Sequence, residues 1–286
     1  MIFTKLLQRL QDFAPEHLAA SYDNIGYQIG WADKDVHKVC IATDATDSVI
    51  AQAVERGADL LISHHPVIWQ PLTKVLAEDY SGGRVISLIR ADINYITMHT
   101  NFDVAHMGRR AADILGLLDC RVFEVTHEGA ATAWQERERF DADMKKAPAQ
   151  GTPSPLGYGR VGRLPTPMTL ADYTAHVRQS FELDSVRVYG NSSGVIASAA
   201  IMPGSSSSDA PQYAAAAAID LYITGEIKHS LALEMLARGI SVIEAGHFGT
   251  EKIFVPAMIE FFGRELPEVE VFAATESSPW AVVSGQ

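Results

Sequence analysis

The sequence contains few of the residues that define several classes of protein. It has only two cysteines, Cys40 and Cys120, so it offers neither a disulfide framework nor a cysteine-type zinc site, and we expect a cytoplasmic protein. No apolar run approaches the roughly 18 residues that span a bilayer, which argues against a membrane partner. The first ten residues lack the hydrophobic core of a signal peptide. Their apolar residues recur at helical spacing, which predicts a first helix.

Basic residues are also scarce. The sequence has 23 Lys and Arg against 35 Asp and Glu, which gives a formal net charge of −12. A nucleic-acid-binding surface needs clustered Lys and Arg, so we expect no nucleic-acid partner. There is no nucleophile-elbow motif and no dinucleotide-binding fingerprint. Gly204–Ser208 could bind an anion through backbone N–H groups, but it lacks the Gly-Lys-Ser/Thr ending of a P-loop, and a plain polar turn explains it equally well.

The remaining composition is that of a globular protein with a sizeable core, since 47% of its 286 residues are apolar and 20% are charged. Short apolar segments alternate with amphipathic ones, which predicts an α/β fold. The predicted strands are 39–43, 59–63, 93–97, 185–189, 195–202, 220–224 and 240–244. The predicted helices are 48–56, 83–91, 109–115, 170–181, 210–218, 231–237 and 252–262.

One segment order occurs twice. Ala58-Asp-Leu-Leu-Ile-Ser63 resembles Ile219-Asp-Leu-Tyr-Ile-Thr224, and each is followed by a helix, a strand and a cluster of metal-type residues. We therefore predict an α/β fold of two similar lobes, with a metal site in the crevice between them, because ligands of α/β sheets bind beyond the carboxyl ends of strands. The alternative is that strand–helix–strand units resemble one another by composition alone.

The predicted lobes are separated by a segment of different character. Residues 1–126 form the expected N-terminal lobe, onto which 263–286 could pack back. Residues 169–286 form the C-terminal lobe. Residues 127–168 are rich in Ala, Gly, Pro and charge and show no strong period, which is typical of an inserted segment or linker.

Five residues with metal-binding side chains stand after predicted strands. They are His64, His65, Asp103, His247 and Glu251. Three imidazoles and two carboxylates exceed the needs of one tetrahedral ion but suit two ions that share a bridge. Their nitrogen and oxygen donors suit Zn, Mn, Fe, Co or Ni. The alternative is that each is an ordinary polar residue of a loop.

The local patterns assign provisional roles to these residues. His64 and His65 are adjacent on an extended backbone and so point to opposite sides, which suits two ions. Glu251 is the natural bridging carboxylate, although its position in the first turn of a helix would also suit the helix dipole. Three further residues, His99, Glu226 and His229, are candidates for moving protons or contacting a substrate. A lone histidine such as His229 is more often a helix-start residue.

The chain resembles the GTP cyclohydrolase 1 type 2 family, also called the Nif-three-like dinuclear-metal proteins. The motifs that show the resemblance are Ser21-Tyr-Asp-Asn-Ile-Gly26, Ser63-His-His-Pro66, His99-Thr-Asn-Phe-Asp103, Gly225-Glu-Ile-Lys-His229 and Gly246-His-Phe-Gly-Thr-Glu251. They occur in the family's order and span nearly the whole chain. The chain departs from the family at Pro203–Ser208, where many members have a Gly-Gly-Ser-Gly turn.

The resemblance implies a two-lobed α/β fold, a toroidal homohexamer and a two-metal centre. It implies that His65 and Asp103 bind one ion, that His64 and His247 bind the other, and that Glu251 bridges them. The family name implies conversion of GTP to a dihydroneopterin triphosphate. We therefore expect a metal-dependent hydrolase that acts on a small molecule, with a nucleotide as the leading candidate. The alternative is a non-enzymatic metal-binding assembly that stores metal, acts as a chaperone or serves as an interaction platform.

Overall fold

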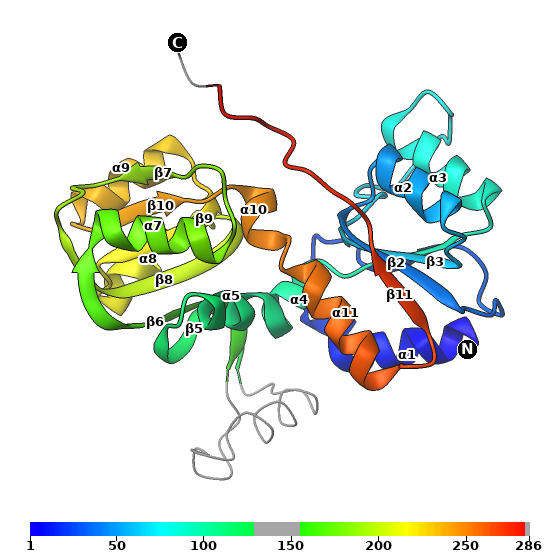
Figure 1. The fold of residues 1–286 in the computed structure, drawn as a ribbon, viewed down its shortest axis with the longest axis horizontal. Helices are drawn as coiled ribbons and strands as arrows, with labels where there is room; N and C mark the ends of the chain where they lie inside the picture. Colours follow the sequence, from blue (N-terminus) through cyan, green and yellow to red (C-terminus); the bar gives the residue numbers. More distant parts are fainter. Residues whose placement is uncertain (129–154, 284–286) are drawn as a thin grey trace, which may run out of the picture. The chain divides into compact units, whose positions relative to one another are not determined.

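The computed structural model describes residues 1–128 and 155–283 (Figure 1). These residues divide into two compact units, each built around one β-sheet. Residues 1–105 and 254–277 form the first unit, and residues 106–128, 155–253 and 278–283 form the second. The mixed α/β class predicted from the sequence is confirmed.

The first unit contains a five-stranded sheet in the order β1-β4-β3-β2-β11, in which only the edge strand β1 is antiparallel to its neighbour. Its strands are β1 (Gly26–Ile29), β2 (Lys38–Asp44), β3 (Leu60–His65), β4 (Asn94–Thr97) and β11 (Glu270–Ala273). Its main helices are α1 (Phe3–Phe13), α2 (Asp47–Glu55), α3 (Tyr80–Arg90) and α11 (Phe254–Glu265), and short helical turns cover Glu16–Leu18 (η1) and Thr100–Phe102 (α4). The central strand β3 is buried along almost its whole length, as its continuous apolar run predicts.

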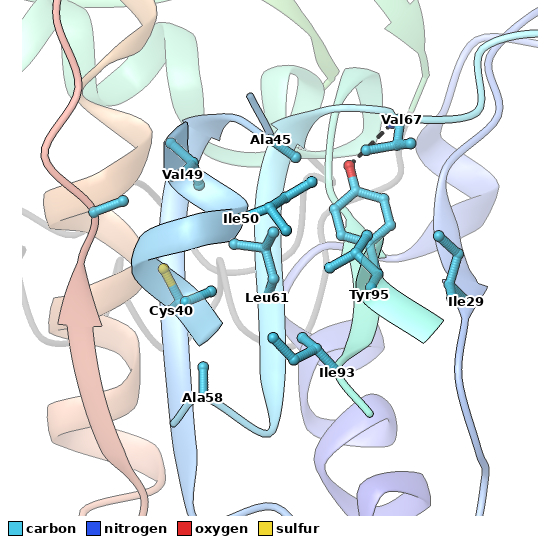
Figure 2. Packing of buried hydrophobic residues seen from close by; sticks show 14 of the residues in the cluster. Ile29, Cys40, Ala45, Val49, Ile50, Ala58, Leu61, Val67, Ile93 and Tyr95 are labelled. Atoms are coloured by element: carbon cyan, nitrogen blue, oxygen red, sulfur yellow. Dashed lines mark hydrogen bonds between the residues drawn. The ribbon is translucent and has the colours of Figure 1, made fainter. Parts of the chain in front are cut away.

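One face of this sheet packs against α2 and α3. Figure 2 shows Leu61 of β3 beside Ile50 of α2, and Tyr95 of β4 with its hydroxyl directed to Val67. The Tyr95 hydroxyl also leaves the apolar layer, because it donates to the carbonyl of His65 at 2.9 Å and accepts from the Val67 N–H at 3.1 Å. The core therefore fixes the backbone that follows β3.

The second unit contains a six-stranded sheet in the order β5-β6-β8-β9-β10-β7. Its strands are β5 (Leu118–His127), β6 (Leu156–Thr169), β7 (Arg187–Tyr189), β8 (Val195–Ser205), β9 (Leu221–Glu226) and β10 (Ser241–Glu244). Its helices are α5 (Gly108–Ile114), α7 (Leu170–Ser180), α8 (Ala210–Ala217), α9 (His229–Ala237) and α10 (His247–Glu251). Strands β8, β9 and β10 are parallel to one another. The antiparallel pairs are β5 with β6, β6 with β8, and β7 with β10.

The two units repeat one topology. In each, a helix leads to an antiparallel edge strand, and three parallel strands joined by two helices follow. The repetition extends to side chains: Asp59 Oδ2 accepts two backbone N–H groups at the start of β2, at 2.8 and 2.9 Å. Asp220 Oδ2 accepts two at the start of β8, both at 2.9 Å. The resemblance between residues 58–63 and 219–224 therefore extends to the structure, which a likeness of composition alone would not require.

The prediction of an inserted segment or linker at residues 127–168 is partly wrong. Residues 156–168 form most of β6, a 14-residue strand paired with both β5 and β8. Its glycines and prolines interrupt the alternation of apolar and polar residues, so periodicity did not predict the strand. Strand β5 was not predicted either. Residues 129–154 of the expected linker lie outside the described residues.

The observed division of the chain also differs from the expected one. Residues 106–127 belong to the second unit and 254–277 to the first, although 263–277 belong to the stretch that was expected to pack back onto the N-terminal lobe. The reason is that α11 and β11 pack beside β2 of the first sheet, although they follow the last strand of the second. Within the described residues, no helix combines the length and the apolar character needed to cross a membrane.

Candidate metal centre

Three histidines gather at one edge of the first sheet. His64 and His65 end β3, and His99 follows the neighbouring parallel strand β4. Because parallel strands end at the same edge of a sheet, these side chains meet there. One ring nitrogen from each of the three lies within 4.8 Å of those of the other two, a spacing at which they could hold a metal ion.

Each of the three imidazoles is held through Nδ1 by an oxygen of the protein. His64 Nδ1 donates to the carbonyl of Met98 at 2.9 Å. His65 Nδ1 pairs with Asp44 Oδ1 at 2.8 Å, and His99 Nδ1 pairs with Asp23 Oδ2 at 2.9 Å. Carbonyl and carboxylate oxygens accept hydrogen bonds, so the proton of each neutral ring resides on Nδ1. The lone pair of each ring is then on Nε2, which is the arrangement usual for metal-binding histidines.

Asp23 is the most strongly held of these acceptors. Its side chain is fully buried, and it also accepts the Thr100 N–H at 3.1 Å. Burial raises the pKa of Asp23, but the hydrogen bond and charge of His99 and the hydrogen bonds from Thr100 outweigh it and lower the pKa. Asp23 therefore remains a carboxylate and fixes the orientation of His99.

Asp103 adds a carboxylate to the same unit. Its Oδ1 lies 3.6 Å from His64 Nε2, close to the roughly 3.3 Å that separates two ligands of one tetrahedral ion with bonds of about 2.0–2.1 Å. Asp103 begins a π-helical turn, Asp103–Met107 (η2), a feature often found at functional sites. The resemblance implied that Asp103 shares an ion with His65, whereas the structure brings its carboxylate to His64.

The second unit presents a further pair of donors on one short helix. His247 and Glu251 are four residues apart on α10, and His247 Nε2 lies 2.9 Å from Glu251 Oε2. Glu226, at the end of β9, places Oε2 3.4 Å from His247 Nδ1. His247 thus has a carboxylate beside each ring nitrogen. His229, by contrast, is exposed and is the first residue of α9. This agrees with its interpretation as a residue that starts a helix.

Glycines create the space that Glu251 occupies. Glu251 is only 3% exposed, and a Cβ atom at Gly204 would lie 2.0 Å from its Oε1. Gly204 has φ +71°, a conformation that glycine adopts without strain. A Cβ at Gly225 would lie 2.8 Å from the Cα of His247. These two strand-end glycines let α10 approach β8 and β9 closely.

The structure argues against anion binding by Gly204–Ser208. The Gly204 N–H donates to Thr250 Oγ1 at 3.1 Å, and the Ser206 N–H donates to the Glu226 carbonyl at 2.9 Å. Ser205 Oγ also donates to the Glu226 carboxylate at 3.3 Å. Two backbone donors that an anion would need are thus already used, and a carboxylate stands beside them. This turn supports Glu251 instead.

Asp44, which orients His65, was not among the residues expected from the sequence. Asp44 stands at the end of β2 and pairs in register with His65 on β3. Its place immediately after the predicted strand 39–43 is the same kind of indication that marked the other candidates. The sequence analysis also gave no role to Asp23 within its motif.

A repeated α/β unit with histidines and carboxylates at its strand ends defines a candidate metal-binding protein. The family described as Duf34/NIF3 (NGG1p interacting factor 3) matches residues 1–279, and the chain belongs to it. This confirms the family that the motifs indicated.

Individual relatives agree with this assignment. A Clostridium acetobutylicum protein named GTP cyclohydrolase 1 type 2 homolog is 30% identical over 244 residues, which cover 85% of this chain and 82% of that protein. The crystal structure of Staphylococcus aureus protein SA1388 is 28% identical, covers 99% of both chains and has a TM-score of 0.83. A Bacillus cereus protein related to NIF3 shares the fold, with 23% identity, a TM-score of 0.84 and coverage of 98% of this chain and 99% of that one.

Proposed function

We propose that this protein is a hydrolase that depends on two divalent metal ions and acts on a nucleotide. The observation that carries the proposal is the histidine group of the first unit, in which protein oxygens hold Nδ1 of the ligand candidates His64 and His65 and of His99 beside them. Ring orientation by outer oxygens is characteristic of metal sites.

The proposed ligands are those expected from the sequence. They are His64, His65, Asp103, His247 and Glu251. The short distance between His64 and Asp103 supports placing these two on one ion, with His65 and His247 on the other and Glu251 as the bridge. The resemblance implies the other pairing, with His65 and Asp103 on one ion and His64 and His247 on the other. The donor types suit Zn, Mn, Fe, Co or Ni.

The residues around the proposed centre have distinct tasks. A pair of divalent ions, when bound, supplies Lewis acidity and an activated water. Asp44 and Glu226 would hold the rings of His65 and His247. His99 is suited to accept a proton at Nε2, because its Nδ1–H already donates to Asp23 and the buried carboxylate would stabilise the resulting imidazolium. His229 stays a candidate for substrate contact.

The names of the relatives support a nucleotide substrate, since several are called GTP cyclohydrolase 1 type 2 homologs. The test is a screen of the purified protein against nucleoside triphosphates and phosphodiesters, with and without each candidate metal. We expect metal-dependent turnover of at least one nucleotide. His99→Ala should abolish turnover and leave the metal content unchanged. Absence of turnover with all metals and all nucleotides would refute the hydrolase proposal.

One observation favours a second function, a metal-binding assembly without enzymatic activity. The turn at Gly204–Ser208 has two of its backbone donors engaged and a carboxylate beside them, so it offers no ready cradle for phosphate. A metal store or chaperone needs no such cradle. It would bind and release metal without turnover in the same screen. In either case we propose a closed homohexamer, which rests on the resemblance.

A further inference from the structure

Trp69 lies beside the histidine group of the first unit with much of its ring in solvent. Its ring centroid is 5.4 Å from that of His99, at an interplanar angle of 66°. The residue is 43% exposed. Single exposed apolar residues are common on protein surfaces, so exposure alone assigns no role. The way in which the preceding backbone is held distinguishes Trp69 from an ordinary exposed residue.

The backbone just before Trp69 is fixed by side chains from β1, β4 and the segment before β1. The Ile68 carbonyl accepts from Asn24 Nδ2 at 2.6 Å and from Gln28 Nε2 at 3.1 Å. The Ile68 N–H donates to Gln28 Oε1 at 3.1 Å, and the Val67 N–H donates to the Tyr95 hydroxyl at 3.1 Å. Four hydrogen bonds thus immobilise the backbone that carries the indole.

One dipeptide fixes both aromatic partners. Asp23 accepts from Nδ1 of His99, while its neighbour Asn24 donates to the residue before Trp69. The His99 ring and the backbone that precedes the indole are therefore set in place before any ligand arrives. Preorganisation of this kind reduces the entropy lost on binding, and a ligand that contacts the two rings gains affinity from it.

We infer that Trp69 is the ring-recognition residue of this site, and that its indole face stacks against a planar heteroaromatic ring such as a nucleobase. An indole offers a broad apolar face to any such ring, and stacking of this type tolerates different bases. A ligand without a planar ring gains nothing from it. The inference rests on the proposed function, because it assumes that the substrate reaches the histidine group.

The experiment measures binding by calorimetry to the full chain loaded with Mn²⁺. The probes are adenosine and guanosine monophosphates, with ribose 5-phosphate as the matched probe without a base. The variants are Trp69→Ala and Trp69→Phe, and Trp31→Ala is the control. Trp31 is 41% exposed in the same unit. Its backbone N–H donates to Asn94 Oδ1 at 3.0 Å, at the opposite end of β4. Metal content is measured for each variant.

We expect Trp69→Ala to weaken nucleotide binding by about fivefold to a hundredfold and ribose 5-phosphate binding by less than about twofold. Trp69→Phe should retain most of the affinity, and Trp31→Ala should match the wild type. Unchanged nucleotide affinity in Trp69→Ala would overturn the inference. So would an equal loss for both kinds of probe, or wild-type protein that binds the nucleotides no better than ribose 5-phosphate.

The same measurements separate this inference from the proposed function. Base-dependent binding that requires Trp69, without any turnover of nucleotides, refutes the hydrolase and leaves the stacking role standing. Turnover of a nucleotide that is unaffected by Trp69→Ala refutes the stacking role and leaves the hydrolase standing.

Discussion

Replacement of Gly204 by alanine should displace Glu251 and so damage the metal centre. The added Cβ would lie 2.0 Å from Glu251 Oε1, whereas ordinary contacts begin at 3.4 Å. One of the two groups must therefore move by more than an ångström. Glu251 is 3% exposed and packed on α10, so its movement changes the position of a proposed bridging ligand.

The loss of unfolding free energy in Gly204→Ala has two parts, which a matched control can separate. Alanine at φ +71° carries the strain of the left-handed region, about 1–2 kcal/mol. Gly239, in the same unit, has φ +78°, and a Cβ added there would meet nothing within 4 Å, so Gly239→Ala measures that strain alone. The clash with Glu251 should add about 1–3 kcal/mol in Gly204→Ala.

The assay combines urea unfolding of the metal-free variants with metal titration. Gly204→Ala should lose more free energy of unfolding than Gly239→Ala and should bind metal at least about tenfold more weakly. Gly239→Ala should keep the wild-type metal affinity. Equal unfolding free energies for the two variants, together with unchanged metal affinity in Gly204→Ala, would show that Gly204 does not make room for Glu251.

Three further predictions concern the outer acceptors and the assembly. Asp44→Asn should weaken metal binding about 10- to 100-fold by loosening His65, whereas Asp47→Asn, an exposed residue of α2 paired with Arg84, should not, as metal titration would show. The folded-state pKa of Asp23 is lowered, so its stabilising contribution is present above about pH 4 and is lost as the pH falls through its folded value. The difference in unfolding free energy between wild type and Asp23→Asn should therefore shrink between pH 6 and pH 3 in urea titrations, and a constant difference would contradict this. Light scattering at micromolar concentration should give about six times the chain's 31.1 kDa, and a monomer would refute the hexamer.

The strands of the parallel core could be predicted because burial on both faces leaves a continuous apolar run. Leu60–Ser63 in β3 shows this, as does Leu221–Thr224 in β9. Strand β6 could not be predicted in this way. Its glycines serve close backbone approaches, as at Gly159, where a Cβ would lie 2.6 Å from the Ile201 carbonyl oxygen. Such glycines interrupt the alternation by which a strand is recognised.

The candidate ligands could be proposed from the sequence because each lies at the end of a strand or within a few residues after one. The residues that orient them could not, because their partners are set by strand pairing. Asp44 meets His65 only through the register of β2 with β3, and Asp23 meets His99 across 76 residues of sequence. Gly204 looked like part of an anion-binding turn, since nothing local relates it to Glu251.

We propose that one chain holds two metal ions through donors of both repeats. Elemental analysis of metal-replete protein measures this for the wild type, for Glu251→Ala and Asp103→Ala, and for the control Asp113→Ala, an exposed residue of α5. We expect two ions per chain in the wild type and in the control, a loss at both positions in Glu251→Ala and the loss of about one ion in Asp103→Ala. One ion or fewer per chain in the wild type would contradict it.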